Sequence, residues 1–480
     1  MGGNKLPIFL YFGVVPLVIS FITLFITTNN FLINIILPLI IGGCIAGGIA
    51  SRTLLNPDGH SRLSFIFLLP IVYTAVFWAI FMLISGGFLG ADSWLFYGIL
   101  HIAMAPIFFI TMLMGEGRLF LWAPLAYELA FVFTIFVSLL IKKVRPAINK
   151  KQVVTLLAVF ILAMGTGAAI QWQRSKTVLP SYGFEYGGGY SSTDLMPYDV
   201  TNPANILPKL EASPTFTIKN SSEMPRLDGA EAAYPVYSAF ANTVYENISK
   251  VDNVMEIVSF TNTIYAYERL LSGEVDIYFG AEPSKEQQEM AKRRGKELVM
   301  TPIGKEAFVF FVNPDNKINS LDVSEIQSIY SGKIKNWSEL GGQNERIIAF
   351  QRPKNSGSQT LLEKIMGDTP IIEPLKEDVP EGMGGIIEQV ADYRNYDNSI
   401  GFSFRFFATG MRGNPVIKLL AINGIEPSPE NIASGKYPFT ANLYAISLKN
   451  NTKPAIEPFL EWMKGPQGQE IIEKIGYIKN

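Results

Sequence analysis

Cysteine and histidine are scarce in this 480-residue chain, which has one cysteine and two histidines. Cys44 is alone, so an intramolecular disulfide and any site with several cysteine ligands are excluded. His60 and His101 both lie in the first third, which excludes a serine–histidine or cysteine–histidine catalytic pair from the remainder. Neither a Walker-type phosphate loop nor a dinucleotide fingerprint is present. We therefore expect no catalytic residue, metal or cofactor, and a protein that is not an enzyme.

Charge is also scarce, since 17% of the residues are charged and 48% are hydrophobic. That composition is too apolar for an ordinary soluble protein. Residues 1–152 carry nine Lys/Arg and four Asp/Glu, whereas residues 153–480 carry 31 and 38. The two regions therefore have net charges of +5 and −7, and they differ in both charge and composition.

Residues 1–172 contain apolar runs of the length that spans a membrane, where about 20 residues cross a hydrocarbon core of about 30 Å. These runs lie near 6–27, 31–50, 63–86, 94–114, 119–141 and 153–172. All but the run at 119–141, which contains Glu128, lack acidic and basic side chains. Buried helices of a soluble domain are disfavoured because such a core does not need six runs in succession. We expect an α-helical membrane domain over residues 1–172 with about six transmembrane helices.

The orientation of these spans depends on their flanking charges. The block "KKVRPAINKK" at 142–151 holds five positive charges before the last run, which places that loop in the cytoplasm and the rest of the chain outside. Six spans would then leave the N-terminus outside too, and Arg52, Arg62 and Arg118 lie in other loops. The positive charges of the loops on the two sides of the membrane are nearly balanced. Our predicted orientation therefore rests on the block at 142–151, which is the strongest cluster.

Three residues within the runs have alternative interpretations. The stretch "IGGC" before Cys44 resembles a lipoprotein cleavage box, but it lies inside the second run, where a small helix-packing residue is favoured. Glu128 and His101 are ionisable groups at membrane depth, where such groups are functional candidates by default. A carboxyl that only forms a helix-packing hydrogen bond is the other interpretation.

After the last run the composition changes. Residues 173–213 are rich in Gly, Pro, Ser and Tyr, which is typical of a tether. From 214 onward, strand-like runs such as "VDIYFG" (275–280), "EAFVFFVN" (306–313) and "RIIAF" (346–350) alternate with helical stretches. This alternation indicates an α/β domain, and about 265 residues exceed the usual single core, so we expect two lobes.

The stretch "FQRPKNSGSQTLLEKIMG" leads from a strand into a helix. Ser356, Gly357 and Ser358 fall at the predicted helix N-terminus, where free N–H groups and the helix dipole favour an anion. Arg352 adds a planar cation suited to an oxyanion. The alternative is an ordinary serine cap.

Two further loops carry polar groups between a strand and a helix. "PRLDGAEAAYPVYSAF" (225–240) places Asp228 and Gly229 before a helix, and "YFGAEPSKEQ" (278–287) places Glu282 after a strand. Three such loops suit a cleft between two lobes.

Residues 214–480 resemble the substrate-binding proteins of phosphate ABC transporters. The segments that carry the resemblance are "LDGAEAAYPVYSAF", "SGEVDIYFGAEPS", "IQSIYSGKIKNWSELGG", "QRPKNSGSQT", "NSIGFSF", "SGKYPFTANLYAI" and "FLEWMKGPQGQEIIEKIGYI". The resemblance implies a two-lobed, type II periplasmic-binding-protein-like fold that closes on phosphate, with no nucleic-acid partner. With the spans, it implies a multi-pass protein of the bacterial cell membrane whose C-terminal domain is extracytoplasmic. The expected partners are phosphate, the lipid bilayer, and an ABC transporter permease or a sensor protein.

By resemblance, the ligand-binding residues come from four places in this sequence. They are Gly229, Ala230, Glu231 and Tyr234 in the first loop, Glu282 where the family usually has an aspartate acceptor, Arg352, and Ser356, Gly357 and Ser358 at the helix start.

The chain departs from the family pattern at two points. Ala230 and Glu231 stand where relatives commonly have serine or threonine, so Glu231 either pairs with Arg352 and fills the anion site or is a solvated residue of the first helical turn. The fused spans are the second departure.

The leading function is oxyanion binding for uptake or sensing. The alternatives are a ligand-free interaction or structural module and a transporter that carries its own receptor domain.

Overall fold

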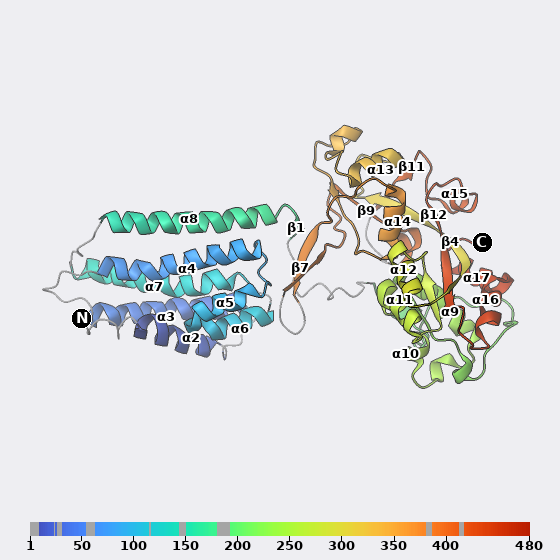
Figure 1. Ribbon diagram of the computed structural model, residues 1–480, viewed down its shortest axis with the longest axis horizontal. Helices are drawn as coiled ribbons and strands as arrows, with labels where there is room; N and C mark the ends of the chain where they lie inside the picture. The colour runs from blue at the N-terminus through green and yellow to red at the C-terminus, as the bar shows by residue number, and fades with distance from the viewer. Residues whose placement is uncertain are drawn as a thin grey trace. The chain divides into compact units, whose positions relative to one another are not determined.

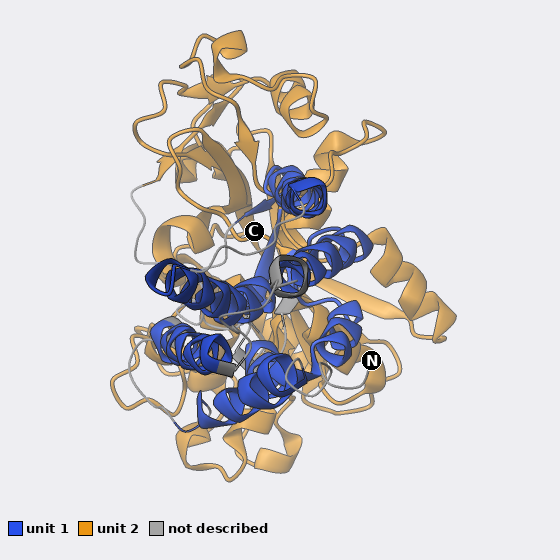
Figure 2. Cartoon of the chain, turned by 90° about the vertical axis from the view of Figure 1, so that its left-hand side faces the viewer, with its two compact units in different colours: residues 1–188, 376–389 blue, residues 189–375, 390–480 orange. Residues whose placement is uncertain are grey.

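The computed structural model divides the chain into two compact units, coloured separately in Figure 2. Unit 1 contains residues 1–188 and 376–389, and unit 2 contains residues 189–375 and 390–480. The residues whose structure is described are 9–23, 25, 31–53, 63–114, 117–143, 150–179, 193–380, 386–411 and 417–480. His60 and Arg62 lie outside these ranges, as does most of the 142–151 charge block.

Unit 1 consists mainly of apolar helices, drawn from blue to green in Figure 1. A π-helical turn at Leu10–Val14 precedes α2 (Val15–Thr23), α3 (Phe31–Thr53), α4 (Leu63–Ser85), α5 (Ser93–Leu100), α6 (Ala105–Met114), α7 (Leu119–Ile141) and α8 (Lys150–Arg174). Most of their core side chains are aromatic or aliphatic, as the sequence of apolar runs requires.

Glycines let α3 pack closely on α7. A Cβ atom at Gly43 would lie 2.4 Å from the Tyr127 carbonyl oxygen, and one at Gly47 would lie 2.6 Å from that of Phe131. Only residues without a Cβ atom allow backbones to approach this closely. Cys44 lies beside Gly43 in α3 and is partly buried, which favours its interpretation as a helix-packing residue.

Within the described residues, four helices are long and apolar enough to cross a membrane: Ile33–Arg52, Leu68–Ser85, Leu119–Ile141 and Lys150–Arg174. The segments Ser93–Leu100 and Ile102–Met112 meet at a bend of 100° and would make a fifth span if counted together. The helix Leu10–Thr23 is shorter. Our expectation of about six spans stays a prediction, because the first apolar run begins in residues outside the described ranges.

Unit 1 also contains a small sheet from two distant parts of the chain. β1 (Val178–Leu179) pairs in parallel with β7 (Lys376–Pro380), which lies next to β8 (Ile386–Val390). Arg174 at the end of α8 pairs with Asp378 at 2.6 Å and with Glu388 at 2.8 Å. A segment of the α/β region therefore packs with unit 1, which the sequence analysis did not predict.

Unit 2 is built on one mixed sheet of seven strands. The strand order is β2 (Leu227–Gly229), β3 (Ile277–Gly280), β12 (Thr440–Leu448), β4 (Leu298–Val312), β9 (Ser399–Phe404) and β6 (Ile348–Ala349), with β10 (Lys418–Leu419) also paired to β4. Residues 298–307 of β4 pair with β12, and residues 308–312 pair with β9. A single long strand therefore runs from one lobe into the other.

Two separate hydrophobic cores define the lobes. Around the first lobe lie α9 (Tyr234–Val244), α10 (Val254–Ile257), α11 (Asn262–Ser272), α12 (Lys285–Arg293), α16 (Ile456–Lys464) and α17 (Pro466–Ile475). The second lobe carries α13 (Val323–Tyr330), α14 (Gly357–Met366), α15 (Pro429–Ala433) and the short pair β5 (Ser320–Leu321) and β11 (Ala421–Ile422). The predicted α/β architecture is confirmed. β3 and β6 lie within predicted strand-like runs, and β4 begins eight residues before the run predicted at 306–313.

The start of the α/β region differs from the expected boundary at residue 214. Val200 and Leu207 are 3% and 5% exposed and belong to the core of the first lobe. Hydrophobic burial therefore begins inside the stretch 173–213 that was expected to be a tether. Residues 180–192 of that stretch lie outside the described ranges.

Candidate functional site

The predicted helix start at Ser356 is confirmed. Ser356 is the N-cap of α14, and its hydroxyl oxygen accepts a hydrogen bond from the Gln359 N–H at 3.3 Å. The first N–H groups of a helix have no acceptor inside the helix. Those of Gly357 and Ser358 therefore point from the helix N-terminus, where the dipole favours negative charge.

This helix end belongs to the second lobe and lies against the first lobe. A Cβ atom at Gly357 would be 3.4 Å from the Cβ atom of Ala281, which directly follows β3. The Ser284 hydroxyl donates to the Asn355 side-chain oxygen at 2.8 Å. Two of the three predicted loops thus meet at the interface between the lobes.

The first loop reaches the same place. Ala230 and Ala281 line a cavity of about 20 Å³ together with Glu306, Phe404 and Tyr477. Phe404 also lies 3.5 Å from the Cβ position of Gly357. A cavity of this volume holds about one water molecule, which is smaller than a tetrahedral oxyanion.

Glu306 is the buried carboxyl group of this cavity, and its side chain is 3% exposed. It accepts hydrogen bonds from the backbone N–H groups of Ala307 at 2.9 Å and Phe406 at 3.2 Å. Burial raises the pKa of Glu306 to about 7. From sequence, Glu306 was expected only to lie in a strand, and the available signal was one acidic residue in an otherwise apolar run.

A second buried carboxylate fixes the first loop. Asp228 accepts hydrogen bonds from the N–H groups of Gly229 and Thr261 at 2.8 and 3.0 Å, and from the Thr261 hydroxyl at 2.7 Å. It also pairs with the guanidinium of Arg269. These partners satisfy a charge that has no contact with solvent.

Gly229 and Ala230 are held by the neighbouring strand. A Cβ atom at Gly229 would lie 2.2 Å from the Phe279 carbonyl oxygen, so only glycine fits there. The Ala230 N–H donates to that same oxygen at 2.7 Å. The backbone donor of Ala230 is therefore already engaged in the structure.

The other two predicted residues of the first loop lie in different surroundings. Glu231 begins a short 3-10 helix, Glu231–Ala233, and is partly exposed. The ring of Tyr234 is 4% exposed and packs on Tyr237 and Phe260 with ring centroids 5.3 and 5.9 Å apart. Burial raises the pKa of Tyr234 to about 12, and the structure places this ring in the core of the first lobe.

Arg352 is paired with a residue that the sequence analysis did not identify. Its Nη1 atom lies 2.7 Å from the Asp392 Oδ1 atom, and both side chains are about one-third exposed or less, at 31% and 26%. Arg352 also lines a cavity of about 40 Å³ in the second lobe with Tyr393 and Ser403. Asp392 lies 40 residues further along the chain, and no local pattern marks it. The pairing of Arg352 with Glu231 stays a prediction.

Glu282 lies on the exposed side of the loop after β3. Its carboxylate is 3.2 Å from the Lys364 ammonium, and the two side chains are 43% and 70% exposed. Lys364 belongs to the last turn of α14. The structure therefore directs Glu282 along α14 and gives it a cationic partner.

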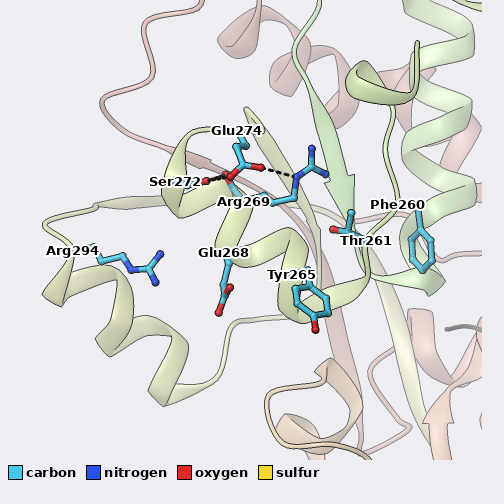
Figure 3. A pocket seen from close by; sticks show the side chains of 8 residues that line it. All are labelled: Phe260, Thr261, Tyr265, Glu268, Arg269, Ser272, Glu274 and Arg294. Carbon is cyan, nitrogen blue, oxygen red and sulfur yellow. Dashed lines mark hydrogen bonds and ion pairs between the residues drawn. The ribbon is translucent and has the colours of Figure 1, made fainter. Parts of the chain in front are cut away.

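A separate surface pocket of about 540 Å³ lies beside the Asp228 network in the first lobe, and Figure 3 shows its side chains. Its lining residues are Phe260, Thr261, Tyr265, Glu268, Arg269, Ser272, Glu274 and Arg294. Arg269 is paired here with Glu274 at 3.3 Å. Acidic and basic groups are mixed, so the lining favours neither anions nor cations.

Comparison with known proteins gives this geometry a family context. Residues 220–466 match the model of the PBP superfamily domain. The phosphate-binding protein PstS of Bacillus subtilis is 30% identical over 168 residues, which are 35% of this chain and 53% of that protein. PstS of Borreliella burgdorferi is 23% identical over 176 residues, or 36% and 63% of the two chains. The chain thus spans between half and two-thirds of the length of these relatives.

Among solved structures, an ABC-type phosphate transport receptor from Vibrio cholerae is similar over 53% of this chain and 100% of its own length. The sequence identity is 16% and the TM-score is 0.39.

Proposed function

This chain belongs to the PBP superfamily, and on that premise we propose that unit 2 binds phosphate or a similar oxyanion between its two lobes. The observation that carries the proposal is the approach of the α14 N-terminus to the loop after β3, with 3.4 Å between Ala281 and the Cβ position of Gly357. Phosphate-binding relatives support the choice of ligand.

The anion is held mainly by the second lobe. The N–H groups of Gly357 and Ser358 and the hydroxyls of Ser356 and Ser358 donate hydrogen bonds, while Arg352 exchanges Asp392 for the ligand. This exchange replaces one anionic partner of Arg352 by another, so no cation is left without a counter-charge.

The first lobe completes the site when the lobes close. Its contributions come from the loop Gly229, Ala230, Glu231 and Tyr234, and from Glu282 as a hydrogen-bond acceptor. An acceptor suits a protonated phosphate and disfavours sulfate, which has no proton to donate at neutral pH. Glu306 adds a donor at the cavity when it is protonated.

The helices of unit 1 anchor the protein in a bacterial cell membrane, with unit 2 on the extracytoplasmic side. Four helices, or five with the bent pair, have suitable length and composition. The protein is not an enzyme. It presents the bound anion to an ABC transporter permease or to a sensor protein, in uptake or sensing.

Isothermal titration of the full chain in detergent with phosphate and with sulfate tests the proposal. We expect saturable binding of phosphate, tighter than that of sulfate. Arg352→Gln should weaken phosphate binding by about tenfold or more, because a charge-assisted bidentate partner is lost. Lys449→Gln removes the same charge from an exposed pair with Glu297 and should leave affinity unchanged. Absence of saturable heat with the unaltered chain would overturn the proposal.

A ligand-free interaction module is the second candidate, and specific contacts favour it. Arg352 and Glu282 each have an oppositely charged partner in Asp392 and Lys364. The cavity between the loops has a volume of only about 20 Å³. If this module is the correct interpretation, phosphate produces no heat with the unaltered chain or with Asp392→Asn, in which Arg352 has lost its carboxylate partner.

A further inference from the structure

A groove of about 440 Å³ lies within unit 1, at the break between α5 and α6. It is bordered by the start of the described chain, by α4 and by α7. Its lining is mostly apolar, with aromatic rings from Phe9, Phe12, Tyr73 and Tyr127. The volume falls in the range of small-molecule sites, about 300–1,000 Å³.

Glu128 is the one Asp, Glu, Lys or Arg among the residues that line this groove. It lies in α7 and is 8% exposed. Its Oε1 atom accepts a hydrogen bond from the Thr74 hydroxyl at 3.0 Å. Its Oε2 atom is buried and has no hydrogen-bond partner among the residues that the structure describes. A carboxylate oxygen left in this way costs free energy until a donor or a cation meets it.

The surroundings leave Oε2 available for a ligand. The Nε2 atom of His101 lies 3.3 Å from the Thr74 hydroxyl oxygen. The Nδ1 atom of His101 lies 3.2 Å from the Tyr97 carbonyl oxygen, which can only accept, so the neutral ring carries its proton on Nδ1 and its Nε2 atom has none to donate to Thr74. The single hydroxyl proton of Thr74 is used on Oε1. Thr74 thereby positions the Glu128 carboxyl group, and neither Thr74 nor His101 supplies a donor to Oε2.

The break between α5 and α6 places polar backbone groups beside the groove. His101 is the residue between Ser93–Leu100 and Ile102–Met112, which meet at 100°. The Tyr73 hydroxyl donates to the Leu100 carbonyl oxygen at 3.0 Å, which satisfies one acceptor of the break. Interrupted helices at membrane depth are tolerated where their backbone lines a cavity.

A metal ion does not fit this site. Hard cations require several oxygen ligands, and no group of three or more His, Cys, Asp or Glu side chains in the described ranges is arranged to hold one. Aromatic faces around a single carboxylate suit a cation with an apolar body, because the rings attract positive charge and the apolar surface leaves water.

We propose that this groove binds an organic ammonium ion, with the charged nitrogen at Glu128 Oε2 and the apolar body against the aromatic lining. This site is confined to unit 1 and is independent of the proposed oxyanion site in unit 2. Glu128 is the binding residue, and Thr74 is its positioning residue.

Titration calorimetry on the full chain in detergent, with 2-phenylethylammonium as the probe, tests this proposal. We expect saturable binding that is weakened about tenfold to a hundredfold in Glu128→Gln, since a hydrogen bond to a charged group is lost. Thr111→Val is the matched control. It removes another buried hydroxyl of unit 1, one that is bonded to the Ile107 carbonyl oxygen and does not line the groove, and it should bind the probe normally.

A second measurement needs no variant. 2-Phenylethanol has a similar shape and a hydrogen-bond donor but no charge, and it should bind the unaltered chain at least about tenfold more weakly. Phosphatidylethanolamine carries the same ammonium group on a lipid. Displacement of the probe by this lipid would identify a membrane source, and no displacement would identify a free amine. Equal binding of alcohol and ammonium, undiminished binding by Glu128→Gln, or no saturable binding to the unaltered chain would overturn the proposal.

Discussion

Each unit of this protein buries carboxyl groups, and the two units treat them differently. In unit 2, Asp228 has no exposed surface, and its carboxylate oxygens accept from two N–H groups and one hydroxyl and pair with Arg269. In unit 1, Glu128 has a single donor, Thr74, and an oxygen without a partner among the described residues. Asp228 therefore fixes a loop, whereas Glu128 keeps one oxygen atom that a ligand can bind.

The largest expected effect is on Asp228. Asp228→Asn removes the buried counter-charge of Arg269, which keeps only the exposed Glu274 as its anionic partner, and weakens the bonds that hold Gly229 and Thr261. Breaking one side of a buried ion pair costs about 3–5 kcal/mol. Denaturant unfolding of the full chain, followed by tryptophan fluorescence, should show a loss of this size. The exposed Asp315→Asn is the control, and an equal loss in both variants would contradict the role given to Asp228.

Glu306 is intermediate between these two carboxyl groups, since two N–H groups bond to it and it still borders a cavity. Burial raises the pKa of Glu306 from 4.5 to about 7. Between these pH values the folded chain binds more protons than the unfolded chain. The free energy of unfolding therefore falls as the pH rises from about 4.5 to about 7, by roughly 3 kcal/mol in total for this group.

Glu306→Gln cannot titrate, so its unfolding free energy should lose this component of the pH dependence. Unfolding curves at pH 5, 6, 7 and 8 on both chains measure the difference in slope. The same ionisation should weaken phosphate binding above pH 7 more in the unaltered chain than in Glu306→Gln, where only phosphate itself titrates. Parallel slopes for the two chains would show that Glu306 does not titrate in this interval.

The smallest expected effect on stability is at Glu128. One of its oxygens already lacks a partner, and the side-chain oxygen of Gln can still accept from Thr74, so Glu128→Gln gives up little. We expect a change of less than about 1 kcal/mol in the free energy of unfolding, or a small gain. Thermal unfolding of the variant in detergent, alongside Asp228→Asn, gives the contrast. A loss at Glu128 as large as that at Asp228 would remove the distinction between the two groups.

The parts of this structure that could be predicted from sequence are those with a local pattern. Strand-like runs predicted β3, β4 and β6, and the serine-rich turn predicted the start of α14 at Ser356. The type of fold followed from the alternation of these elements and from family resemblance.

The rest depends on contacts between distant residues. Asp392 meets Arg352 from 40 positions away, and Arg174 meets Asp378 across 204. Neither pair is marked by a periodic pattern or a local composition in the sequence. An ion pair requires only that the fold brings two oppositely charged side chains into contact. The position of Glu282 beside Lys364 and of Glu306 in the cavity lining likewise depends on residues distant in sequence.

Hydrogen exchange at the start of α14 tests the oxyanion account most directly. The N–H groups of Gly357 and Ser358 have no acceptor within the helix, and phosphate would become their acceptor. With saturating phosphate, a peptide covering residues 352–360 of the full chain should exchange more slowly, and Arg352→Gln should need about tenfold more phosphate, or more, for the same protection. Unchanged exchange of that peptide in the presence of phosphate would contradict the assignment of this helix end as the anion site.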